Sequence, residues 1–373
     1  MKKFYVVLAV MLMAAMMLAA CKPAAPAMEE PAEEVVEEPV VEVEPFDVCM
    51  VTDSAGIGDK SFNDAVWKGL QQAVTDFSIN ANYIESKSAD DYAPNLQACV
   101  DAEPDMIVCV GFMMSDACEA SVKANPDIYY ISIDIDWLTY PNLLGVGAFM
   151  DQSSFLAGYV SAGMTKTGKL AGYTGFFGPV VQIFLDGFWL GMTKYNEVHG
   201  TSVEMLGYDP AAMDETAAIG SWIDVDAGRA LSETFLDNGA DIFYPVCGNV
   251  GVGTAAAILD RETANPEFKG YIFGMDQDWI ETNPQYAPQI LGSALKKMEV
   301  PVYNSIKSLV ETGEWIGGKA YILTLENGGT AIAWNADADI PADLLAEAEA
   351  YIPKIISGEQ PSLSPEFLAL YPR

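Results

Sequence analysis

From Phe46 onward, short runs of β-branched and other apolar residues alternate with amphipathic segments of helical length. Parallel strands need crossover connections, which are usually helices, so this alternation predicts a parallel α/β architecture. Four of the early runs are almost entirely apolar, as strands buried on both faces of a sheet are. The predicted strands lie at 46–52, 105–111, 127–134 and 143–149, and then at 169–175, 202–209, 240–248 and 269–276.

These strands form two series, and each has its own helices. The predicted helices lie near 64–78, 92–103 and 114–125 in the first series, and near 181–198, 226–239 and 249–263 in the second. A strand at 290–297, a helix near 299–312, two short strands around 320–333 and a helix near 341–357 follow. A chain that finishes one half, builds the other and returns predicts two doubly wound, Rossmann-like lobes joined by a multi-strand hinge. We expect lobe 1 to contain 46–149 plus 297–318, and lobe 2 to contain 150–296 plus 319–373.

The chain begins with the pattern of an export signal. Lys2 and Lys3 precede an apolar run, 4–20, that ends in small residues before Cys21. This pattern predicts a secretory signal peptide over 1–20 rather than a transmembrane helix, for which about 17 apolar residues is the lower limit. The Leu-Ala-Ala-Cys junction resembles a bacterial lipobox, which implies lipidation of Cys21 and a membrane anchor.

The next segment has a composition that cannot form a core. Residues 22–46 contain eight glutamates among Pro, Ala and Val, with no aromatic residue before Phe46. Such a segment is too charged and too rich in proline to bury apolar surface. We therefore expect 21–45 to be an acidic, flexible tether, extended by charge repulsion, that holds the folded part off the membrane of a bacterial cell envelope.

Charge and histidine content exclude several classes of function. The formal net charge is −34 at pH 7, so the chain should be repelled by nucleic acid phosphates and by anionic lipid surfaces. His199 is the only histidine, which excludes multi-histidine zinc sites and leaves a single candidate base for hydrolysis. It precedes Gly200 at the end of a predicted helix, where a histidine interacts with the helix C-terminus. We expect no enzyme activity, no metal and no other cofactor.

The other cysteines number five and have irregular spacings. Cys49, Cys109 and Cys247 lie in strand-like runs, where a free cysteine is usually a small buried hydrophobe. Outside the cytoplasm, a bridge from Cys99 to Cys118 or from Cys109 to Cys118 is also compatible with the sequence. Sequence alone does not decide the connectivity.

Polar residues follow many of the predicted strands. In open α/β sheets, ligands bind beyond the carboxyl ends of the strands. An Asp or Asn at a single such position is compatible with a local role as a helix N-cap. Five carboxylates around one edge instead predict a ligand-binding cleft. The strand-end residues are Asp53, Gly111 to Asp116, Asp134, Asp136, Gly248, Asn249 and Asp276.

The segment 53–63, with the sequence DSAGIGDKSFN, follows the first strand and opens a helix. Its glycines permit a tight turn, and Asp59, Ser61 and Asn63 supply polar side chains. The GxGxxG and GxxxxGK[ST] patterns of phosphate-binding loops are absent, and acidic residues flank the turn. A neutral ligand rich in hydroxyl and N–H donors fits this loop better than a phosphate.

This segment resembles the D-x-G-G-x-x-D-K-S-F-N signature of the basic membrane protein family of bacterial lipoproteins, the purine-nucleoside receptor A type of ABC-transporter binding protein. Further blocks resemble the family in the same order, so that the resemblance covers nearly all of 47–312. These blocks are GFMMSDA (111–117), YYISIDID (129–136), SFLAGYVSAGMTKTGKLAGYTG (154–175), FLDGFWLGM (184–192), GADIFYPVCGNVGVG (239–253), FGMDQD (273–278) and SALKKMEVPVY (293–303).

The resemblance implies a type I periplasmic-binding-protein fold with a nucleoside held between two lobes. It implies that Phe62 stacks on one face of the base and Tyr244 on the other. Asp53, with Asp134 or Asp136, would accept hydrogen bonds from the base edge. Asp276 would bind the ribose hydroxyls beside Lys296, and the turn Gly248 to Gly251 would meet the sugar. The ligand-binding residues expected in full are Asp53, Ser54, Phe62, Asn63, Asp116, Asp134, Asp136, Tyr244, Gly248, Asn249, Gly251, Asp276 and Lys296.

The resemblance also implies a function. We expect a monomeric, lipid-anchored receptor that binds a nucleoside, with a purine base favoured, and delivers it to an ABC permease. The turns SAGIG (54–58), GFFGPVV (175–181) and GNVG (248–251) depart from the family pattern. These departures leave another hydroxyl-rich solute as an alternative ligand. A ligand sensor or surface adhesin of the same fold is the alternative function, and a nucleoside hydrolase would need a metal or a general acid that the sequence does not show.

Overall fold

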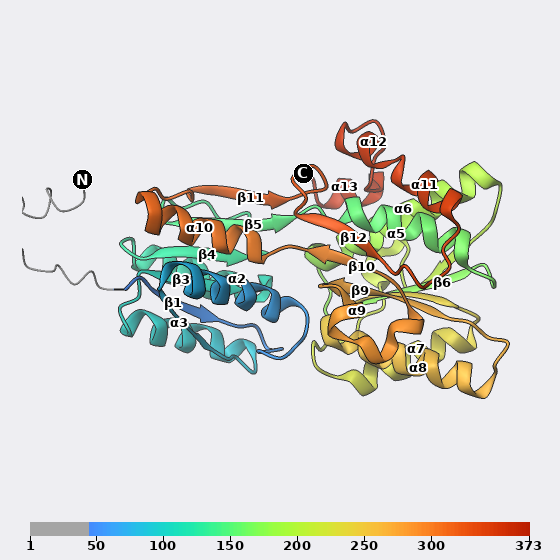
Figure 1. The fold of residues 1–373 in the computed structure, drawn as a ribbon, viewed down its shortest axis with the longest axis horizontal. Helices are drawn as coiled ribbons and strands as arrows, with labels where there is room; N and C mark the ends of the chain where they lie inside the picture. Colours follow the sequence, from blue (N-terminus) through green and yellow to red (C-terminus); the bar gives the residue numbers. More distant parts are fainter. Residues whose placement is uncertain (1–44) are drawn as a thin grey trace, which may run out of the picture. The chain divides into compact units, whose positions relative to one another are not determined.

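Two six-stranded sheets organise residues 45–373, the part of the chain that the computed structural model describes (Figure 1). The predicted signal peptide, Cys21 and the tether up to residue 44 lie outside the described residues. The first sheet has the order β11-β5-β4-β3-β1-β2, and all of its pairings are parallel. Its strands are β1 (Asp47–Val51), β2 (Asn80–Ile84), β3 (Met106–Val110), β4 (Tyr129–Ile133), β5 (Leu143–Ala148) and β11 (Lys319–Leu323).

The second sheet repeats this plan in the order β12-β10-β9-β8-β6-β7. It is parallel except for β12, which pairs antiparallel with β10. Each sheet therefore forms a doubly wound lobe. The strands are β6 (Lys169–Thr174), β7 (Glu204–Leu206), β8 (Ile242–Val246), β9 (Tyr271–Asp276), β10 (Ile290–Lys296) and β12 (Thr330–Trp334).

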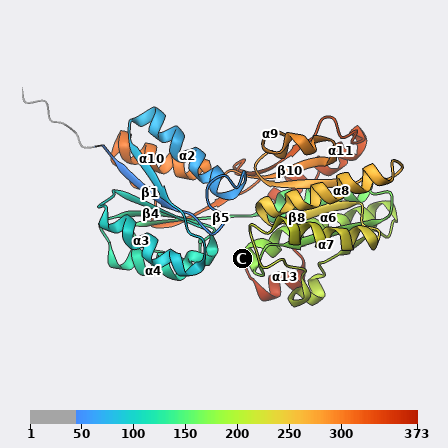
Figure 2. The same ribbon diagram turned by 90° about the horizontal axis from the view of Figure 1, so that it is seen from below.

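Helices cover both faces of the first sheet (Figure 2). Alternate residues of a strand point to opposite faces, so β1 divides its side chains between two cores. Val48 and Met50 pack in the core beneath α2 and α10, whereas Cys49 and Val51 pack on the other side. The helices are α2 (Phe62–Phe77) and α10 (Glu299–Thr312) on one face, and α3 (Tyr92–Asp101) and α4 (Ser115–Ala124) on the other.

The second sheet has the same layered arrangement, with additional C-terminal helices. α5 (Met150–Met164) and α6 (Pro179–His199) cover one face, and α7 (Val225–Asp237) and α8 (Gly251–Ala264) cover the other. Leu344, Ala348 and Phe367 join the core on the α5 and α6 side, so the last helices belong to this lobe. The remaining helices are α9 (Trp279–Thr282), α11 (Ala342–Glu349), α12 (Ile352–Ile356) and α13 (Pro365–Leu370).

The chain crosses between the sheets three times, after β5, after β10 and between β11 and β12. The sequence places 319–373 wholly in the second lobe, but β11 pairs with β5, so Lys319–Leu323 lies in the first sheet. The two short strands expected around 320–333 are present, although they belong to different sheets. β2 is absent from the predicted strands because its sequence, NANYI, is polar and mostly exposed at the sheet edge. Among the described helices, none combines the length and apolarity needed to cross a membrane.

A disulfide joins Cys49 of β1 to Cys99 of α3. Neither bridge considered from the sequence is formed, because Cys109 and Cys118 are free and buried. Cys49 is a buried strand residue, as expected, but it is bonded rather than free. Cys247 is free and buried.

Candidate functional site

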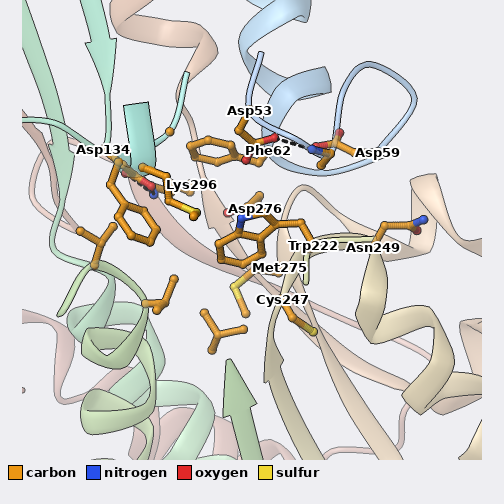
Figure 3. A pocket seen from close by; sticks show the side chains of 18 of the residues that line it. Asp53, Asp59, Phe62, Asp134, Trp222, Cys247, Asn249, Met275, Asp276 and Lys296 are labelled. Atoms are coloured by element: carbon orange, nitrogen blue, oxygen red, sulfur yellow. Dashed lines mark hydrogen bonds and ion pairs between the residues drawn. The ribbon is translucent and has the colours of Figure 1, made fainter. Parts of the chain in front are cut away.

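A cavity of about 60 Å³ lies between the two lobes at the carboxyl ends of their strands (Figure 3). We call it the central cavity. Asp53 follows β1, Gly111 follows β3 and Asp134 follows β4. From the second lobe, Asp276 and Lys296 are the last residues of β9 and β10. The sequence prediction that strand-end residues meet in one cleft is thus realised for both lobes. Gly248 and Asn249, which follow β8, also line this cavity.

The loop between β1 and α2 fixes Asp53 in the wall of the central cavity. Its carboxylate accepts hydrogen bonds from Ala55 N at 2.9 Å and from Asn63 Nδ2 at 2.7 Å. Asp59 in turn accepts from the backbone N–H groups of Ser61 and Asn63. Burial raises the pKa of Asp53 to about 6, against the lowering effect of its hydrogen bond from Asn63. Asn63 therefore positions Asp53 from behind and does not itself line the cavity.

Asp276 presents a second buried carboxylate. Ser61 Oγ donates a hydrogen bond of 2.6 Å to its Oδ2 atom, which joins the two lobes. Burial raises the pKa of Asp276 to about 6, while the Lys296 ammonium acts in the opposite direction. The backbone of Asp276 has φ = 64° and that of Asp134 has φ = 63°, both in the left-handed region. Aspartate tolerates this region better than most residues, and non-glycine residues held there cluster at functional sites.

Lys296 and Asp134 form an ion pair across the lobes. Lys296 Nζ donates to both carboxylate oxygens of Asp134, at 2.6 Å for Oδ2, and both side chains are buried. The same ammonium lies 5.2 Å from the ring centroid of Phe62 and 5.8 Å from that of Phe184. Because the two buried charges pair with each other, neither is buried without a partner of opposite charge.

Aromatic side chains enter the central cavity from both lobes. Phe62 comes from the first turn of α2, and Trp222 comes from the loop between β7 and α7. Trp222 packs against Phe176 with ring centroids 5.1 Å apart and against Phe112 edge-to-face at 6.4 Å. Gly175 makes room for it, since a Cβ atom there would lie 2.3 Å from the Trp222 ring. Phe112 lies within the strand-end range 111–116 expected to line the cleft, whereas Trp222 and Phe184 were not among the expected residues. Trp222 lies some distance after a short edge strand, so the strand-end rule does not point to it.

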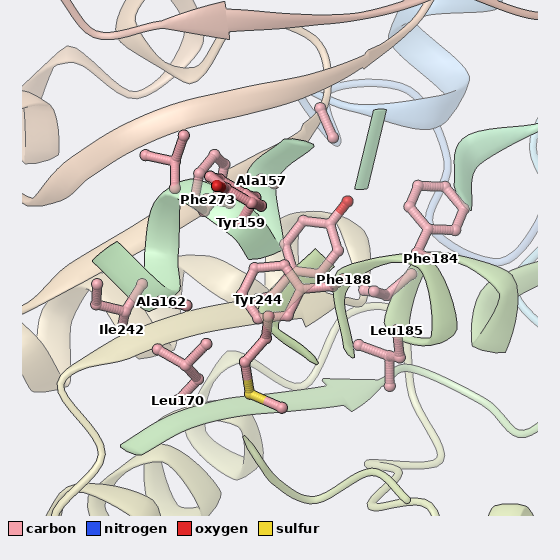
Figure 4. Packing of buried hydrophobic residues seen from close by; sticks show 14 of the residues in the cluster. Ala157, Tyr159, Ala162, Leu170, Phe184, Leu185, Phe188, Ile242, Tyr244 and Phe273 are labelled. Atoms are coloured by element: carbon pink, nitrogen blue, oxygen red, sulfur yellow. The ribbon is translucent and has the colours of Figure 1, made fainter. Parts of the chain in front are cut away.

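Tyr244 does not reach the central cavity. It is fully buried in the core of the second lobe, stacked on Phe188 at 4.7 Å, and its hydroxyl bonds to Ser154 Oγ at 2.6 Å (Figure 4). Strand alternation explains this, because Tyr244 in β8 points to the face covered by α5 and α6. In this structure, Trp222 and Phe184 are the aromatic residues that the second lobe supplies to the cavity.

Four further predicted residues also lie outside the central cavity. Ser54 is half-buried in the loop after β1, and Asp116 is exposed in the first turn of α4. Gly251 begins α8 and packs against Trp279. Asp136 lines a second, adjoining cavity, which is described below.

His199 does not line the central cavity. It ends α6, as predicted, and its Nε2 atom lies 2.9 Å from Glu347 Oε2. Within residues 45–373, no cluster of three or more His, Cys, Asp or Glu side chains could hold a metal ion. The central cavity therefore offers carboxylate acceptors, one paired ammonium, backbone N–H groups and aromatic surfaces. These groups suit the binding of a flat, hydroxyl-bearing molecule, and they do not include a nucleophile beside a general base.

Comparisons with known proteins identify the family to which the chain is similar. Residues 46–361 match the model of a family described as ABC transporter substrate-binding protein, PnrA-like. A CD4+ T-cell-stimulating antigen of Listeria innocua is 26% identical over 325 residues, which cover 84% of this chain and 87% of that protein. The ABC transporter nucleoside-binding protein BmpA of Lactococcus lactis is 25% identical over 312 residues, covering 80% of this chain and 85% of that protein.

A solved structure shares the whole architecture. The solute-binding protein of an ABC transporter system from Aeropyrum pernix K1 superposes with a TM-score of 0.69 and 26% identity, over 87% of this chain and 89% of that one. The predicted type I periplasmic-binding fold is confirmed by this match and by the two parallel-dominated sheets.

Proposed function

This chain belongs to the family of PnrA-like ABC transporter substrate-binding proteins, and we propose that its ligand is a nucleoside with a purine base. Members of this family are substrate-binding proteins and not enzymes; they bind a small molecule and deliver it to a permease. The central cavity is the proposed binding site, and the membrane permease is the proposed partner of the loaded protein.

One observation carries the proposal: aromatic side chains from both lobes line the same cavity as three buried carboxylates that have no ion-pair partner among the described residues, those of Asp53, Asp59 and Asp276. A purine is a flat π-system, and stacking on an aromatic side chain contributes about 1–3 kcal/mol per base. A carboxylate accepts hydrogen bonds from two neighbouring hydroxyls in strong, charge-assisted geometry. We assign Phe62 and Trp222 to the base, Asp53 to its N–H groups and Asp276 to the ribose. The relative in Lactococcus lactis, which is named a nucleoside-binding protein, supports a nucleoside as the ligand.

We further propose that lipidated Cys21 anchors the protein to the outer side of the membrane and that the acidic segment up to residue 45 serves as its tether. The eight glutamates of that segment repel one another and would hold the lobes away from the lipid surface. The folded part then works as a monomer, since each chain contains both lobes of the cleft.

The proposal is tested by ligand binding to the soluble fragment 45–373, which contains both sheets and their cores. After any copurified ligand is removed, adenosine, inosine and guanosine should each raise the melting temperature, whereas free sugars and amino acids should not. A ligand at a hundredfold excess over Kd stabilises the native state by roughly 2.7 kcal/mol. A melting temperature unchanged by every nucleoside would refute the ligand assignment.

The stacking role has a matched control on the same helix. Phe62→Ala should weaken nucleoside binding about 5- to 100-fold in calorimetry, because it removes one stacking surface. Phe77 ends the same helix and packs against Tyr303, away from the cavity. Phe77→Ala should therefore lower stability and leave the Kd unchanged. Equal Kd values for Phe62→Ala and the parent protein would exclude Phe62 from the site.

A further inference from the structure

A second cavity, of about 440 Å³ and half open to solvent, adjoins the central one. We call it the side chamber. The two cavities share Asp134, Val180 and Lys296, so the buried ion pair forms part of the wall between them. The chamber is bounded by Ala148 and Phe149 at the first crossing between the lobes, by Ile183 of α6 and by Ile322 of β11.

The C-terminal segment 362–373 forms the remaining wall and lies beyond the residues matched by the family model. Polar contacts to buried groups hold it in place. Ser364 N donates to Asp186 Oδ2 at 2.7 Å, and the buried Asp151 carboxylate pairs with the Arg373 guanidinium. Arg373 also lies 3.8 Å from the ring centroid of Phe149. This wall of the chamber is therefore held in place by specific contacts within the chain.

The chamber wall is mostly apolar and contains one carboxylate without a cationic partner. Arg373 is paired with Asp151, and Lys296 is paired with Asp134. Among the described residues, no Lys, Arg or His nitrogen lies within ion-pair distance of Asp136. Its carboxylate packs directly on Gly147, where a Cβ atom would lie 2.2 Å from Oδ2. The apolar and aromatic residues that line the chamber include Trp137, Phe149, Ile183, Leu363, Phe367 and Tyr371.

These observations describe a continuation of the ligand site with its own chemistry. Apolar and aromatic walls favour an apolar group of the ligand, because its burial removes apolar surface from water. The carboxylate of Asp136 is half-buried and requires a donor once water is displaced. The chamber shares Asp134, Val180 and Lys296 with the central cavity, so a substituent on a ligand bound there would enter the chamber beside the Asp134–Lys296 pair.

We propose that the side chamber holds an apolar substituent, bearing an N–H or O–H donor for Asp136, on the nucleoside that occupies the central cavity. The ligand is then a substituted nucleoside rather than a simple one. This inference rests on the proposed function, because it requires the unsubstituted part to bind beside Phe62 and Asp276. It adds a substrate class that the central cavity alone does not specify.

Calorimetry on fragment 45–373 tests the proposal with adenosine and two benzyl derivatives. One carries the benzyl group on the exocyclic amine of the base, and the other carries it through sulfur on the 5′ carbon of the ribose. At least one derivative should bind no more weakly than adenosine, and the preferred one identifies the end of the nucleoside that faces the chamber. If adenosine binds and both derivatives bind more than about tenfold more weakly, the chamber is not a subsite, but the proposed function stands. If no nucleoside binds, both proposals fail.

Variants that fill the chamber localise the substituent. Ile183→Trp should weaken binding of the preferred derivative about tenfold and change adenosine binding less than about twofold. Ile322→Trp fills the same chamber from the first lobe and provides a second variant if the first does not fold. Ile356→Trp, at an exposed position on α12, is the matched control and should change neither affinity. The proposal would be overturned if each of these two variants, Ile183→Trp and Ile322→Trp, weakened the binding of adenosine and of the preferred derivative by the same factor.

The donor is tested separately. A hydroxyl group added to the benzyl ring should tighten binding to the parent protein, and Asp136→Asn, which keeps the size of the side chain, should reduce that gain at least threefold. A hydroxybenzyl derivative that binds no better than the benzyl derivative would remove Asp136 from the proposal.

Discussion

At the scale of single residues, the two carboxylates with raised pKa values make the site sensitive to pH. Burial raises the pKa of both Asp53 and Asp276 from 3.8 to about 6. The folded, empty protein therefore binds more protons than the unfolded chain between pH 4 and 6. Stability from these groups is fully present below about pH 4 and is lost as the pH rises through about 6. The empty site is thus strained at neutral pH by two desolvated charges.

A ligand that donates hydrogen bonds to these carboxylates relieves that strain only when they are ionised. Nucleoside affinity should therefore be constant near pH 7–8 and fall as the pH drops below about 6, with up to two protons taken up on ligand release. Isothermal titration from pH 5 to 8 in buffers of different ionisation enthalpy measures both quantities. Asp276→Asn should weaken binding at pH 7.5 and flatten the pH dependence. A Kd that is independent of pH in the parent protein would contradict the role of both carboxylates.

Sequence reasoning located the site residues whose position depends on strand ends. Asp53, Asp134 and Asp276 could be predicted to line the cavity because a parallel sheet gathers its carboxyl ends at one edge. Lys296 was expected there only from the resemblance to the family. The prediction for Tyr244 was wrong. The resemblance to the family implied a ring in the cleft, but the alternation of side chains along β8 directs this ring into the core. Trp222 could not be found in this way, because its position depends on the path of a loop after an edge strand.

At the scale of secondary structure elements, α5 and α6 pack unusually closely through glycines. A Cβ atom on Gly158 would lie 1.9 Å from the Phe188 carbonyl oxygen, and one on Gly191 would lie 1.9 Å from the Phe155 carbonyl oxygen. Both clashes involve helix backbone, which cannot move aside as a flexible side chain can. The glycines thus set the distance between the two helices that support the second lobe.

Gly158→Ala tests this packing because two effects oppose each other. In an isolated helix, alanine is more favourable than glycine by about 1 kcal/mol. In the folded protein, the added methyl group must separate α5 from α6, and overpacking of this kind destabilises by about 1–3 kcal/mol. We expect a net loss of stability in urea denaturation followed by circular dichroism. A gain in stability would mean that the helices are not in close contact.

The Cys49–Cys99 disulfide fixes α3 to β1 in the first lobe. The two cysteines are separated by 50 residues, so the bridge restricts the unfolded chain substantially. Cys99→Ala should lower the free energy of unfolding by about 2–4 kcal/mol. Cys118 lies in the same core cluster but is unbonded, and Cys118→Ala is the matched control. A reducing agent should destabilise the parent protein and the Cys118→Ala variant, and leave Cys99→Ala unchanged; destabilisation of all three would point to another cause.

The alternation of strand and helix patterns predicted most strands and the long helices of both lobes, because each pattern reports local burial, but it missed the polar edge strand β2. Connections between lobes depend on pairing partners, which periodicity does not encode. β11 shows this limit, since a short strand at 319–323 is recognisable from the sequence but its pairing with β5 is not. The disulfide shows the same limit. The Cα atoms of Cys49 and Cys99 lie 5.7 Å apart because α3 packs on the sheet, and the spacing of the two cysteines in the sequence does not predict this.

At the scale of the whole molecule, hydrogen bonds and an ion pair connect the two lobes across the cleft. Ser61 bonds to Asp276, Asp134 pairs with Lys296, and Gln277 Nε2 donates to the Ser61 carbonyl oxygen at 2.9 Å. Asp134, Asp276 and Lys296 line the cavity, whereas Ser61 and Gln277 do not. Gln277 therefore allows closure to be weakened without removing any group that faces the ligand.

Gln277→Ala should reduce nucleoside affinity through the population of the closed state. An intramolecular hydrogen bond contributes about 0.5–1.5 kcal/mol, so the closed state should lose about 2- to 10-fold in population relative to the open state. The apparent Kd of a ligand that binds only the closed state rises as the population of that state falls. Because the contacts within the cavity remain, the change should appear mainly as faster dissociation, which the fluorescence of Trp222 can report in stopped-flow experiments.

The control for this prediction is Gln97→Ala, which removes an exposed glutamine of α3 that bonds only to Asp101 on its own helix. It should leave the dissociation rate unchanged. Small-angle X-ray scattering of the empty Gln277→Ala variant should show a larger radius of gyration than the empty parent, with the two converging when nucleoside is saturating. An unchanged dissociation rate in Gln277→Ala would mean that the Gln277–Ser61 contact follows closure without contributing to it, and that the Ser61–Asp276 and Asp134–Lys296 contacts determine how long the ligand stays bound.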